Sequence, residues 1–325
     1  MQGKLSALYI AIFIITFVIA YFTEKGLIKL LNGRAAQPIY TDGPIWHTKK
    51  SGTPTMGGLA FLPPCILCLV FSIVYYAFFD KSSKVALSLI ISLSFVIMHS
   101  LVGIFDDSLK LRRQDNKGLS PKEKLILQLL ISLLFVMARV RFMGDTTAIS
   151  FPFGSINLGI FYYPIAIFVV LGIINCANLT DGIDGLACSV ACAIAVSFFV
   201  IFPGTVDVSI LSLITAGTAI AFLFFNINPA AVFMGDTGSL LFGAMVSACS
   251  FSSGKPYLSI ILGGVYVIEG ISVILQVLVF KTTKKRLFKM APLHHHLEKC
   301  GYSENKICLI AVIFTLILSV FARLL

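Results

Sequence analysis

Long apolar runs recur along almost the whole chain, and they constrain its fold more than any other feature. A run of about 20 residues is enough for a helix to cross the roughly 30 Å hydrocarbon layer of a bilayer. Apolar residues make up 58% of the sequence and charged residues only 12%, whereas a soluble domain carries about 25% charged residues. We therefore expect an all-α polytopic membrane protein, a single domain over residues 1–325, with about ten transmembrane helices near Leu5–Thr23, Met56–Phe79, Val85–Phe105, Leu125–Ala138, Ile160–Ile174, Leu186–Phe202, Val208–Phe225, Ser239–Ser252, Leu258–Phe280 and Lys306–Leu325.

Three of these runs, Leu125–Ala138, Ile160–Ile174 and Ser239–Ser252, are short for a full crossing. We expect them to extend into their flanking residues or to tilt. The first run, Leu5–Thr23, exceeds the apolar core of a signal peptide, about 7 to 15 residues, and has no small-residue cleavage pattern. It is therefore predicted to remain as the first span.

The basic residues predict how the helices are oriented. Eighteen of the 25 lysines and arginines fall in alternate connections, beginning with the one that follows the first span. Cytoplasmic loops carry the excess of basic residues, so this face is predicted to be cytoplasmic and both termini to be extracytoplasmic. The net charge of +10 suits an anionic lipid leaflet. The lipid bilayer is the expected partner, and no nucleic acid is expected.

A polar stretch from Asn175 to Leu186 interrupts the apolar pattern with two asparagines and two aspartates. An ionised aspartate at the centre of a bilayer costs about 2.5 to 3.5 kcal/mol even on the lenient insertion scale. Asp181 and Asp184 should therefore meet water, a cation or a ligand. Gly182 and Gly185 each follow an aspartate, and they let the backbone turn or approach a ligand closely.

Five aspartates fall at the cytoplasmic ends of the predicted spans or in cytoplasmic loops. Carboxylates at one level, framed by basic loops, suit a divalent cation and a phosphorylated ligand better than an ion pathway across the bilayer. We therefore expect the active site on the cytoplasmic face, around Asp106, Asp107, Asp181, Asp184 and Asp236.

Three further motifs have both a functional and an ordinary structural interpretation. The segment from Lys50 to Gly58 forms a turn whose amides and lysine could hold a phosphate, or it is an ordinary Gly/Pro loop. The pair Asp106-Asp107, followed by Lys110, suits a metal and a phosphate, or it is a solvated helix end. Asn226 to Asp236 adds an amide, an aromatic ring and a carboxylate, or simply provides turn chemistry.

The segment from Pro292 to Glu298 contains three adjacent histidines, His294, His295 and His296. Three successive side chains of a regular element cannot all point at one metal, so a zinc site is not expected here. Contact with a phosphate or a sugar is the better interpretation.

These motifs together resemble the phospho-N-acetylmuramoyl-pentapeptide transferases, the MraY family of the polyprenyl-phosphate N-acetylhexosamine-1-phosphate transferases. The resemblance runs from the first span to the last, and the motifs follow in the same order. Leu297 stands where the family usually has Phe, and Tyr302 where Trp is common. The matching segments are Lys50 to Gly58, Asp106-Asp107, Asn175 to Leu186, Phe233 to Leu240 and Pro292 to His296.

The resemblance implies transfer of phospho-MurNAc-pentapeptide from UDP-MurNAc-pentapeptide to undecaprenyl phosphate, giving lipid I and UMP with Mg²⁺ in a bacterial cell membrane. It implies that Asp236 is the magnesium ligand, Asp106 a base or nucleophile, and Asp107 a neighbouring essential acid. Phe233 would stack on uracil. The implied uridine pocket consists of Lys50, Thr55, Gly182, Asp184, Asn226 and Phe233; the implied diphosphate and sugar contacts are Asn175, Asn178, Asp181, Lys110, Lys122, Gln276, His294, His295 and His296.

Alternatives stay open at this point. A sister transferase of GlcNAc-1-phosphate shares the paired aspartates, and an ion-coupled transporter would need acids deep within the spans, of which Glu269 is the example. For Asp106 we favour positioning or deprotonating the lipid phosphate over a covalent aspartyl phosphate, because a phosphate oxygen is already a competent nucleophile. The sequence leaves the oligomeric state open, a homodimer included.

Overall fold

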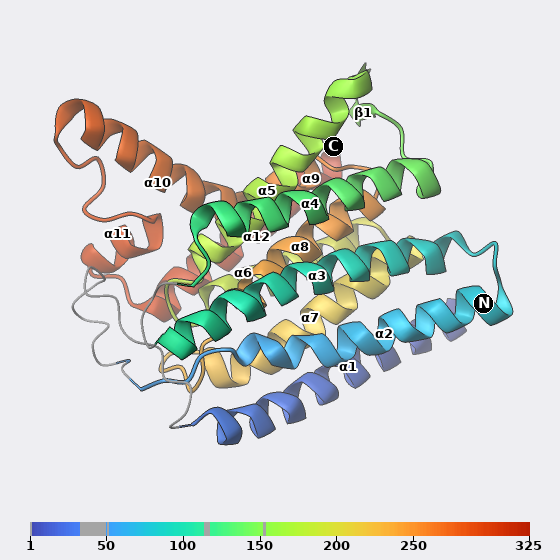
Figure 1. The fold of residues 1–325 in the computed structure, drawn as a ribbon, viewed down its shortest axis with the longest axis horizontal. Helices are drawn as coiled ribbons and strands as arrows, with labels where there is room; N and C mark the ends of the chain where they lie inside the picture. The colour runs from blue at the N-terminus through green and yellow to red at the C-terminus, as the bar shows by residue number, and fades with distance from the viewer. Residues whose placement is uncertain (1, 33–49, 51, 114–117, 152–153) are drawn as a thin grey trace.

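The computed structural model describes residues 2–32, 50, 52–113, 118–151 and 154–325, and the chain is helical through most of them (Figure 1). Several helices are prolonged by short helical turns, at Gly57–Phe61, Tyr75–Phe79, Arg139–Met143 and Gly159–Phe161. The main helices are α1 (Gln2–Leu31), α2 (Leu62–Val74), α3 (Lys84–Arg113), α4 (Pro121–Ala138), α5 (Tyr162–Thr180), α6 (Leu186–Ile201), α7 (Val206–Asn226), α8 (Gly235–Ser252), α9 (Leu258–Leu262), α10 (Gly264–Thr283), α11 (Leu293–Lys299) and α12 (Glu304–Leu324).

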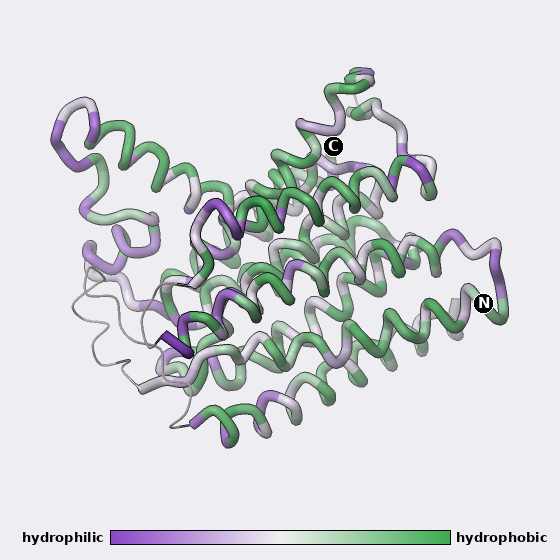
Figure 2. Tube along the Cα trace, viewed as in Figure 1, coloured by the Kyte–Doolittle hydropathy of each residue, from purple (hydrophilic) through white to green (hydrophobic). Residues whose placement is uncertain are grey.

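Most of these helices have the length and composition of membrane spans. Within the described residues, eight helices are long and apolar enough to cross a membrane, and α6 is a shorter apolar helix. Figure 2 shows apolar residues along the helices and hydrophilic residues gathered mainly toward the ends of the bundle. The expected all-α polytopic membrane fold is confirmed.

Helix α8 occupies the centre of the bundle, and although it has 18 residues it is not one of the eight helices that are apolar enough to cross a membrane. Every residue from Thr237 to Phe251 is buried, and α8 packs against α3, α5, α6 and α7. Small residues allow the close approach: a Cβ atom on Gly243 would lie 2.6 Å from the Cα atom of Ile174 in α5. Because protein rather than lipid surrounds α8, its polar first turn, which carries Asp236, is tolerated.

The expected ninth span, Leu258–Phe280, is not one helix, and this prediction was wrong. It divides into α9 and α10 at Gly263. Adjacent glycines allow a sharp change of direction in a helix, because no side chain fills the bend. A Cβ atom on Gly263 would lie 2.3 Å from the carbonyl oxygen of Ser259, so the bend leaves no room for a larger residue. After it, α10 diverges from the bundle (Figure 1).

Two short strands, which the sequence did not suggest, lie between α4 and α5. β1 (Ala148–Phe151) and β2 (Gly154–Asn157) form an antiparallel pair. Next to them, the guanidinium group of buried Arg139 donates to both carboxylate oxygens of Asp145, at 2.8 and 3.1 Å. This region is the end of the bundle where α3 begins and α8 ends.

Both chain ends lie at this same end of the bundle (Figure 1). Lys255, which follows α8, donates from Nζ to the carbonyl oxygen of Leu325 at 3.0 Å. The opposite end carries Asp106, Asp107 and Asp236. The termini therefore lie on the side away from the aspartates, as expected, while the side of the membrane that each end faces stays a prediction.

Candidate active site

Three aspartates from two helices converge at one end of the bundle. Asp106 and Asp107 lie near the end of α3 and are buried, and Asp236 lies in the first turn of α8 and is half-buried. One carboxylate oxygen of each lies within 4.8 Å of the others. Gly103 makes this possible, because a Cβ atom there would lie 2.4 Å from the carbonyl oxygen of Asp236. We call these three residues the aspartate cluster.

Two lysines compensate part of the negative charge of the aspartate cluster. Lys110 Nζ lies 2.6 Å from Asp106 Oδ2 and 3.0 Å from Asp236 Oδ2. Lys124 Nζ lies 2.5 Å from the same Asp236 oxygen. Three carboxylates and two ammonium groups leave one negative charge, which a cation or a proton must balance. Hard carboxylate oxygens so close together are the donor set that Mg²⁺ or Ca²⁺ prefers.

Asp107 also holds the first turn of α8 in place. Its Oδ1 accepts from the backbone N–H of Asp236, and its Oδ2 accepts from the backbone N–H and the hydroxyl of Thr237, at 2.7 to 3.1 Å. The first amides of a helix have no partner within the helix and carry partial positive charge, so a carboxylate there is stabilising. Asp107 thus fixes the orientation of Asp236.

Lys124 belongs to the cluster although the sequence analysis selected Lys122. Helix α4 starts with a capping box, in which Ser120 and Glu123 bond to each other's backbone amides. Residues two apart on a helix project in nearly opposite directions, about 200° apart. Lys124 therefore reaches Asp236, whereas Lys122 is exposed and the described residues give it no contact with the aspartates. Recognising the capping box in the sequence would have located the start of α4, and so would have shown which of the two lysines faces the aspartates.

The two asparagines of the polar stretch take different positions. Asn178 donates from Nδ2 to Asp236 Oδ1 and to Ser239 Oγ, both at 2.8 Å, so it belongs to the site. Asn175 donates from Nδ2 to Gln128 Oε1 at 2.8 Å. One helical turn thus moves Asn175 away from the aspartates, into the interface between α4 and α5.

A second polar cluster forms around Asp184, in the connection between α5 and α6. Lys50 Nζ lies 2.7 Å from Asp184 Oδ1 and 2.7 Å from Glu304 Oε2. Asp184 Oδ2 accepts at 3.0 Å from both Asn228 Nδ2 and the backbone N–H of Ala230. The sequence analysis had not selected Glu304 or Asn228. Both residues stand near helix ends on the same side of the membrane, which could have suggested that they belong to the site. That position alone does not predict which residue each of them contacts.

Asp181 is half-buried, and its carboxyl group is influenced by the negative charges of both clusters. Burial, together with the negative charges of Asp236, Asp107 and Asp184, raises the pKa of its carboxyl group to about 8. At neutral pH a carboxyl group with this pKa is largely protonated, so it can donate a hydrogen bond to an anion.

Asn226 and Phe233 shape the loops around these clusters. Asn226 is buried; its Oδ1 accepts from the N–H of Gly185 and its Nδ2 donates to the carbonyl of Val232. Phe233 is half-buried, and its backbone pairs with the segment before α2, as its N–H donates to the carbonyl of Pro54 at 2.8 Å. Asn226 therefore connects the loop before α6 to the loop before α8 through hydrogen bonds. Phe233 remains partly accessible.

The glycine pair Gly57-Gly58 packs against the start of α8. The amides of Gly57 and Gly58 donate to the carbonyls of Phe233 and Met234, at 2.9 and 3.0 Å. These two amides are not available for a phosphate, so that part of the interpretation of this segment was wrong. Thr55 is buried beside them, where a Cβ atom on Gly235 would meet Thr55 Oγ1 at 3.1 Å.

We predict that Gly58→Ala destabilises the protein strongly. A Cβ atom on Gly58 would lie 2.2 Å from the backbone nitrogen of Gly238, and neither backbone can move without displacing α8. The expected loss is about 3 kcal/mol or more, measured as thermal unfolding in detergent. The matched control is Gly172→Ala in α5, where a Cβ atom meets nothing within 4 Å and a small gain is expected. Equal melting temperatures for both variants would contradict the packing described.

The three histidines lie on the short helix α11, which Glu269 of α10 anchors. The backbone N–H of His294 donates to Glu269, with both carboxylate oxygens at 3.2 Å, and His294 Nδ1 lies 3.1 Å from Glu269 Oε2. His294 is fully buried and packs on Gly182, where a Cβ atom would lie 2.2 Å from His294 Nε2. The histidine segment is thereby fastened to the connection that carries Asp181 and Asp184.

The other two histidines have separate partners. His295 Nδ1 lies 2.6 Å from Glu298 Oε2. His296 Nδ1 accepts from the backbone N–H of Lys289 at 3.1 Å. The three rings therefore point to three different groups rather than to one centre.

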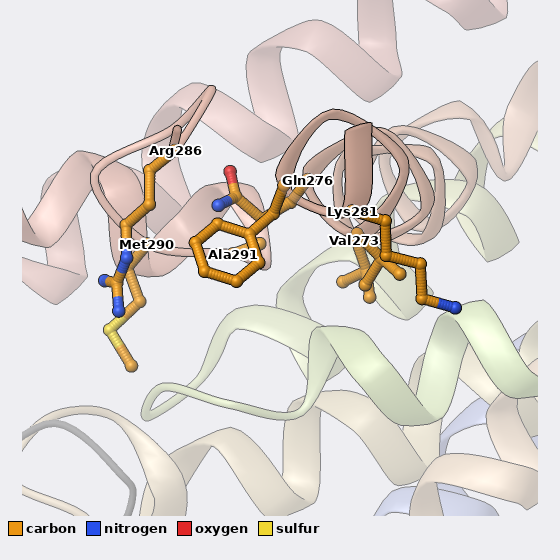
Figure 3. Close-up of a pocket in the computed structure, with 8 residues that line it drawn as sticks. Val273, Gln276, Lys281, Arg286, Met290 and Ala291 are labelled. Atoms are coloured by element: carbon orange, nitrogen blue, oxygen red, sulfur yellow. The ribbon is translucent and has the colours of Figure 1, made fainter. Parts of the chain in front are cut away.

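Gln276 lies on α10 beside a pocket of about 410 Å³. Its Oε1 accepts from the N–H of Phe288 at 2.8 Å. Figure 3 shows Val273 and Gln276 on α10, with Arg286 and Met290 on the segment that follows. Gln276 thus lines this pocket, between α10 and the segment that follows it, and has no contact with the aspartates among the described residues.

The sequence was compared with known protein families and proteins. The model of glycosyl transferase family 4 matches residues 89–254, and the first signature of the phospho-N-acetylmuramoyl-pentapeptide-transferases matches residues 50–62. A phospho-N-acetylmuramoyl-pentapeptide-transferase from Clostridium botulinum is 44% identical over 287 residues, 87% of this chain and 86% of the relative. The chain belongs to the phospho-N-acetylmuramoyl-pentapeptide-transferase family.

Relatives from other bacteria agree with the family assignment. The phospho-N-acetylmuramoyl-pentapeptide-transferase of Clostridium perfringens is 40% identical over 307 residues, 94% of this chain and 92% of the relative. That of Carboxydothermus hydrogenoformans is 40% identical over 318 residues, 94% of each. The two family matches contain Lys50 and the aspartate cluster, so these residues lie within the parts of the chain that match the family.

Proposed function

We propose that this protein transfers phospho-MurNAc-pentapeptide from UDP-MurNAc-pentapeptide to undecaprenyl phosphate, forming lipid I and UMP in the bacterial cytoplasmic membrane. The observation that carries the proposal is the aspartate cluster with its two lysines, at one end of a membrane bundle of this family. Phosphoryl transfer depends mainly on alignment and on neutralising charge, and this cluster supplies both.

Mg²⁺ is the proposed cofactor, held by Asp236 with Asp106 beside it. Mg²⁺ takes oxygen ligands at about 2.0 to 2.1 Å and keeps several waters, so one or two carboxylates plus substrate phosphates suffice. When bound, the ion neutralises the diphosphate. Asp236 retains Asn178 as a hydrogen-bond donor on Oδ1, which holds the carboxylate in one rotamer.

The donor nucleotide is proposed to bind next to Asp184. This carboxylate is held from several sides by Lys50, Asn228 and the Ala230 amide. Asn228 and Ala230 belong to the loop between α7 and α8, which also carries the half-buried Phe233. A flat aromatic ring beside fixed polar groups suits a nucleobase. The distance along the loop from Phe233 to Asp236, three residues, lets one ligand reach from this pocket to the aspartate cluster.

The lipid phosphate is proposed to approach the aspartate cluster near Asp106 and Lys110. An oxygen of the lipid phosphate attacks the sugar-bearing phosphorus, and UMP leaves with the electrons of the broken P–O bond. Asp106 accepts from the N–H of Leu119 at 2.8 Å and pairs with Lys110 at 2.6 Å. A carboxylate held in this way suits positioning or deprotonation of the lipid phosphate, the role we assign to it.

The two alternatives raised by the sequence have less support. Family membership disfavours a GlcNAc-1-phosphate transferase. Glu269, the acid available to a transporter, instead anchors α11 through His294. The homodimer stays a prediction.

The test is a transfer assay in sealed inside-out membrane vesicles, in which only the cytoplasmic face meets added nucleotide. Labelled UDP-MurNAc-pentapeptide should give labelled lipid, and labelled UDP-GlcNAc should give none. Transfer only from UDP-GlcNAc would favour the sister transferase, and transfer only after the vesicles are opened would place the site on the other face. In purified enzyme freed of lipid, exchange of labelled UMP into the donor would contradict our assignment of Asp106.

A further inference from the structure

Among the buried polar atoms that have no hydrogen-bond partner in the described residues, three lie on the neighbouring helices α3 and α4. They are His99 Nε2 on α3, and Gln128 Nε2 and Ser132 Oγ on α4. All three side chains are 0% exposed. Buried polar atoms in folded proteins are almost always satisfied, so three of them in two neighbouring helices require an explanation.

Helices α3 and α4 run antiparallel, with a contact at each end of their common seam. At one end the rings of Phe95 and Phe135 stack with their centroids 4.1 Å apart. At the other end Asp106 accepts from the N–H of Leu119, just before α4. Between these two contacts, the buried faces of α3 and α4 pack against each other along the seam.

The three unsatisfied atoms belong to residues within two turns of each other along this seam. His99 is one helical turn beyond Phe95 on α3, and Ser132 is about one turn before Phe135 on α4. Gln128 follows one turn further along the same face of α4. The group therefore lies between the aromatic pair and the aspartate cluster.

The hydrogen-bonding needs of the three atoms are complementary. His99 Nδ1 lies 3.0 Å from the carbonyl of Phe95, so Nδ1 carries the proton and Nε2 of the neutral ring is an acceptor. Gln128 Oε1 accepts from Asn175, which fixes the amide and leaves Nε2 as a donor. The hydroxyl of Ser132 both donates and accepts. One acceptor, one donor and one hydroxyl match the capacity of a single water molecule.

We propose that a water molecule is bound in this enclosed polar site between α3 and α4. It donates to His99 Nε2 and to Ser132 Oγ, and it accepts from Gln128 Nε2. The water holds the Gln128 amide in the orientation that binds Asn175. One turn along α5 from Asn175, Asn178 donates to Asp236. By fixing Gln128 and thus Asn175, the bound water stabilises the part of α5 that carries this active-site contact. This inference does not depend on the identity of the substrates.

The test compares melting temperatures of purified variants in one detergent. If water is bound, Ser132→Ala removes one of its partners, and the melting temperature should fall by about 2 to 6 °C. His99→Phe should lower it similarly, and Ser132→Ala retains the test if His99→Phe does not fold. The control is Ser197→Ala, whose hydroxyl bonds within its own helix to the carbonyl of Ala193, so no such fall is expected.

A dry site gives the opposite sign. An unpartnered hydroxyl in a dry interior is unfavourable, so Ser132→Ala would then leave the melting temperature unchanged or raise it, and that result would overturn the proposal. A density map that resolves ordered waters elsewhere in the interior should show one within hydrogen-bonding distance of at least two of the three atoms. Its absence there would also overturn the proposal.

Discussion

Asp236→Asn is expected to lower the rate of transfer at least about 10³-fold while the protein still folds. The substitution removes the negative charge that binds the cation and leaves Lys110 and Lys124 without their shared partner. Loss of one preorganised electrostatic contact in an active site costs about 10² to 10³ in rate, and here a metal ligand is lost as well. The amide of Asn still accepts from Asn178, so the packing of α8 is preserved.

The measurement is the initial rate of lipid-linked product at saturating donor, with a melting curve for each preparation. Asp80→Asn is the matched control, since among the described residues its carboxylate accepts hydrogen bonds from Ser82 alone, in the connection between α2 and α3. Its rate should match that of the wild type. A wild-type-like rate for Asp236→Asn at ordinary Mg²⁺ concentration would remove Asp236 from the metal site.

Lys124→Met is expected to lower the rate of transfer about 10²-fold. The Lys124 ammonium lies 2.5 Å from Asp236 Oδ2, where it offsets charge on the carboxylate and on a bound diphosphate. Methionine keeps much of the apolar length of the side chain but no charge, so the effect on folding should be small. Steady-state rates over a range of donor concentrations will show the loss.

Lys122→Met is the control for this variant, two residues away on the same helix. Lys122 is exposed, so its substitution should change the rate by less than about twofold. The opposite result, a large loss at Lys122 and none at Lys124, would restore the assignment made from the sequence and contradict the geometry of α4.

The sequence predicted the membrane fold well because apolar length and helix formation are local properties. It did not predict that the run from Leu258 to Phe280 divides, because whether Gly263 bends a helix depends on what packs against it. The position of α8 also depends on packing. Its 18 residues are too polar for a helix that faces lipid, and its burial at the centre of the bundle explains why this composition is tolerated.

The sequence predicted which acidic residues form the site, but it predicted fewer of the residues that contact them. Asp106, Asp107 and Asp236 could be brought together because each stands at the same end of an apolar run. The pair Lys50 and Glu304 is separated by 254 residues, and no local pattern joins them. Asn175 and Asn178 differ by a single helical turn, yet only Asn178 reaches Asp236, because the interface between α4 and α5 holds Asn175.

The position of a bound divalent ion tests the account most directly. Mn²⁺ prefers the same oxygen ligands as Mg²⁺ and gives an anomalous X-ray signal, so crystals of the protein grown with Mn²⁺ and UMP can locate it. The account predicts one peak in coordination distance of the Asp236 carboxylate, beside Asp106, and loss of that peak in Asp236→Asn. A peak at His294, His295 or His296, or a peak at the cluster that persists in Asp236→Asn, would contradict it.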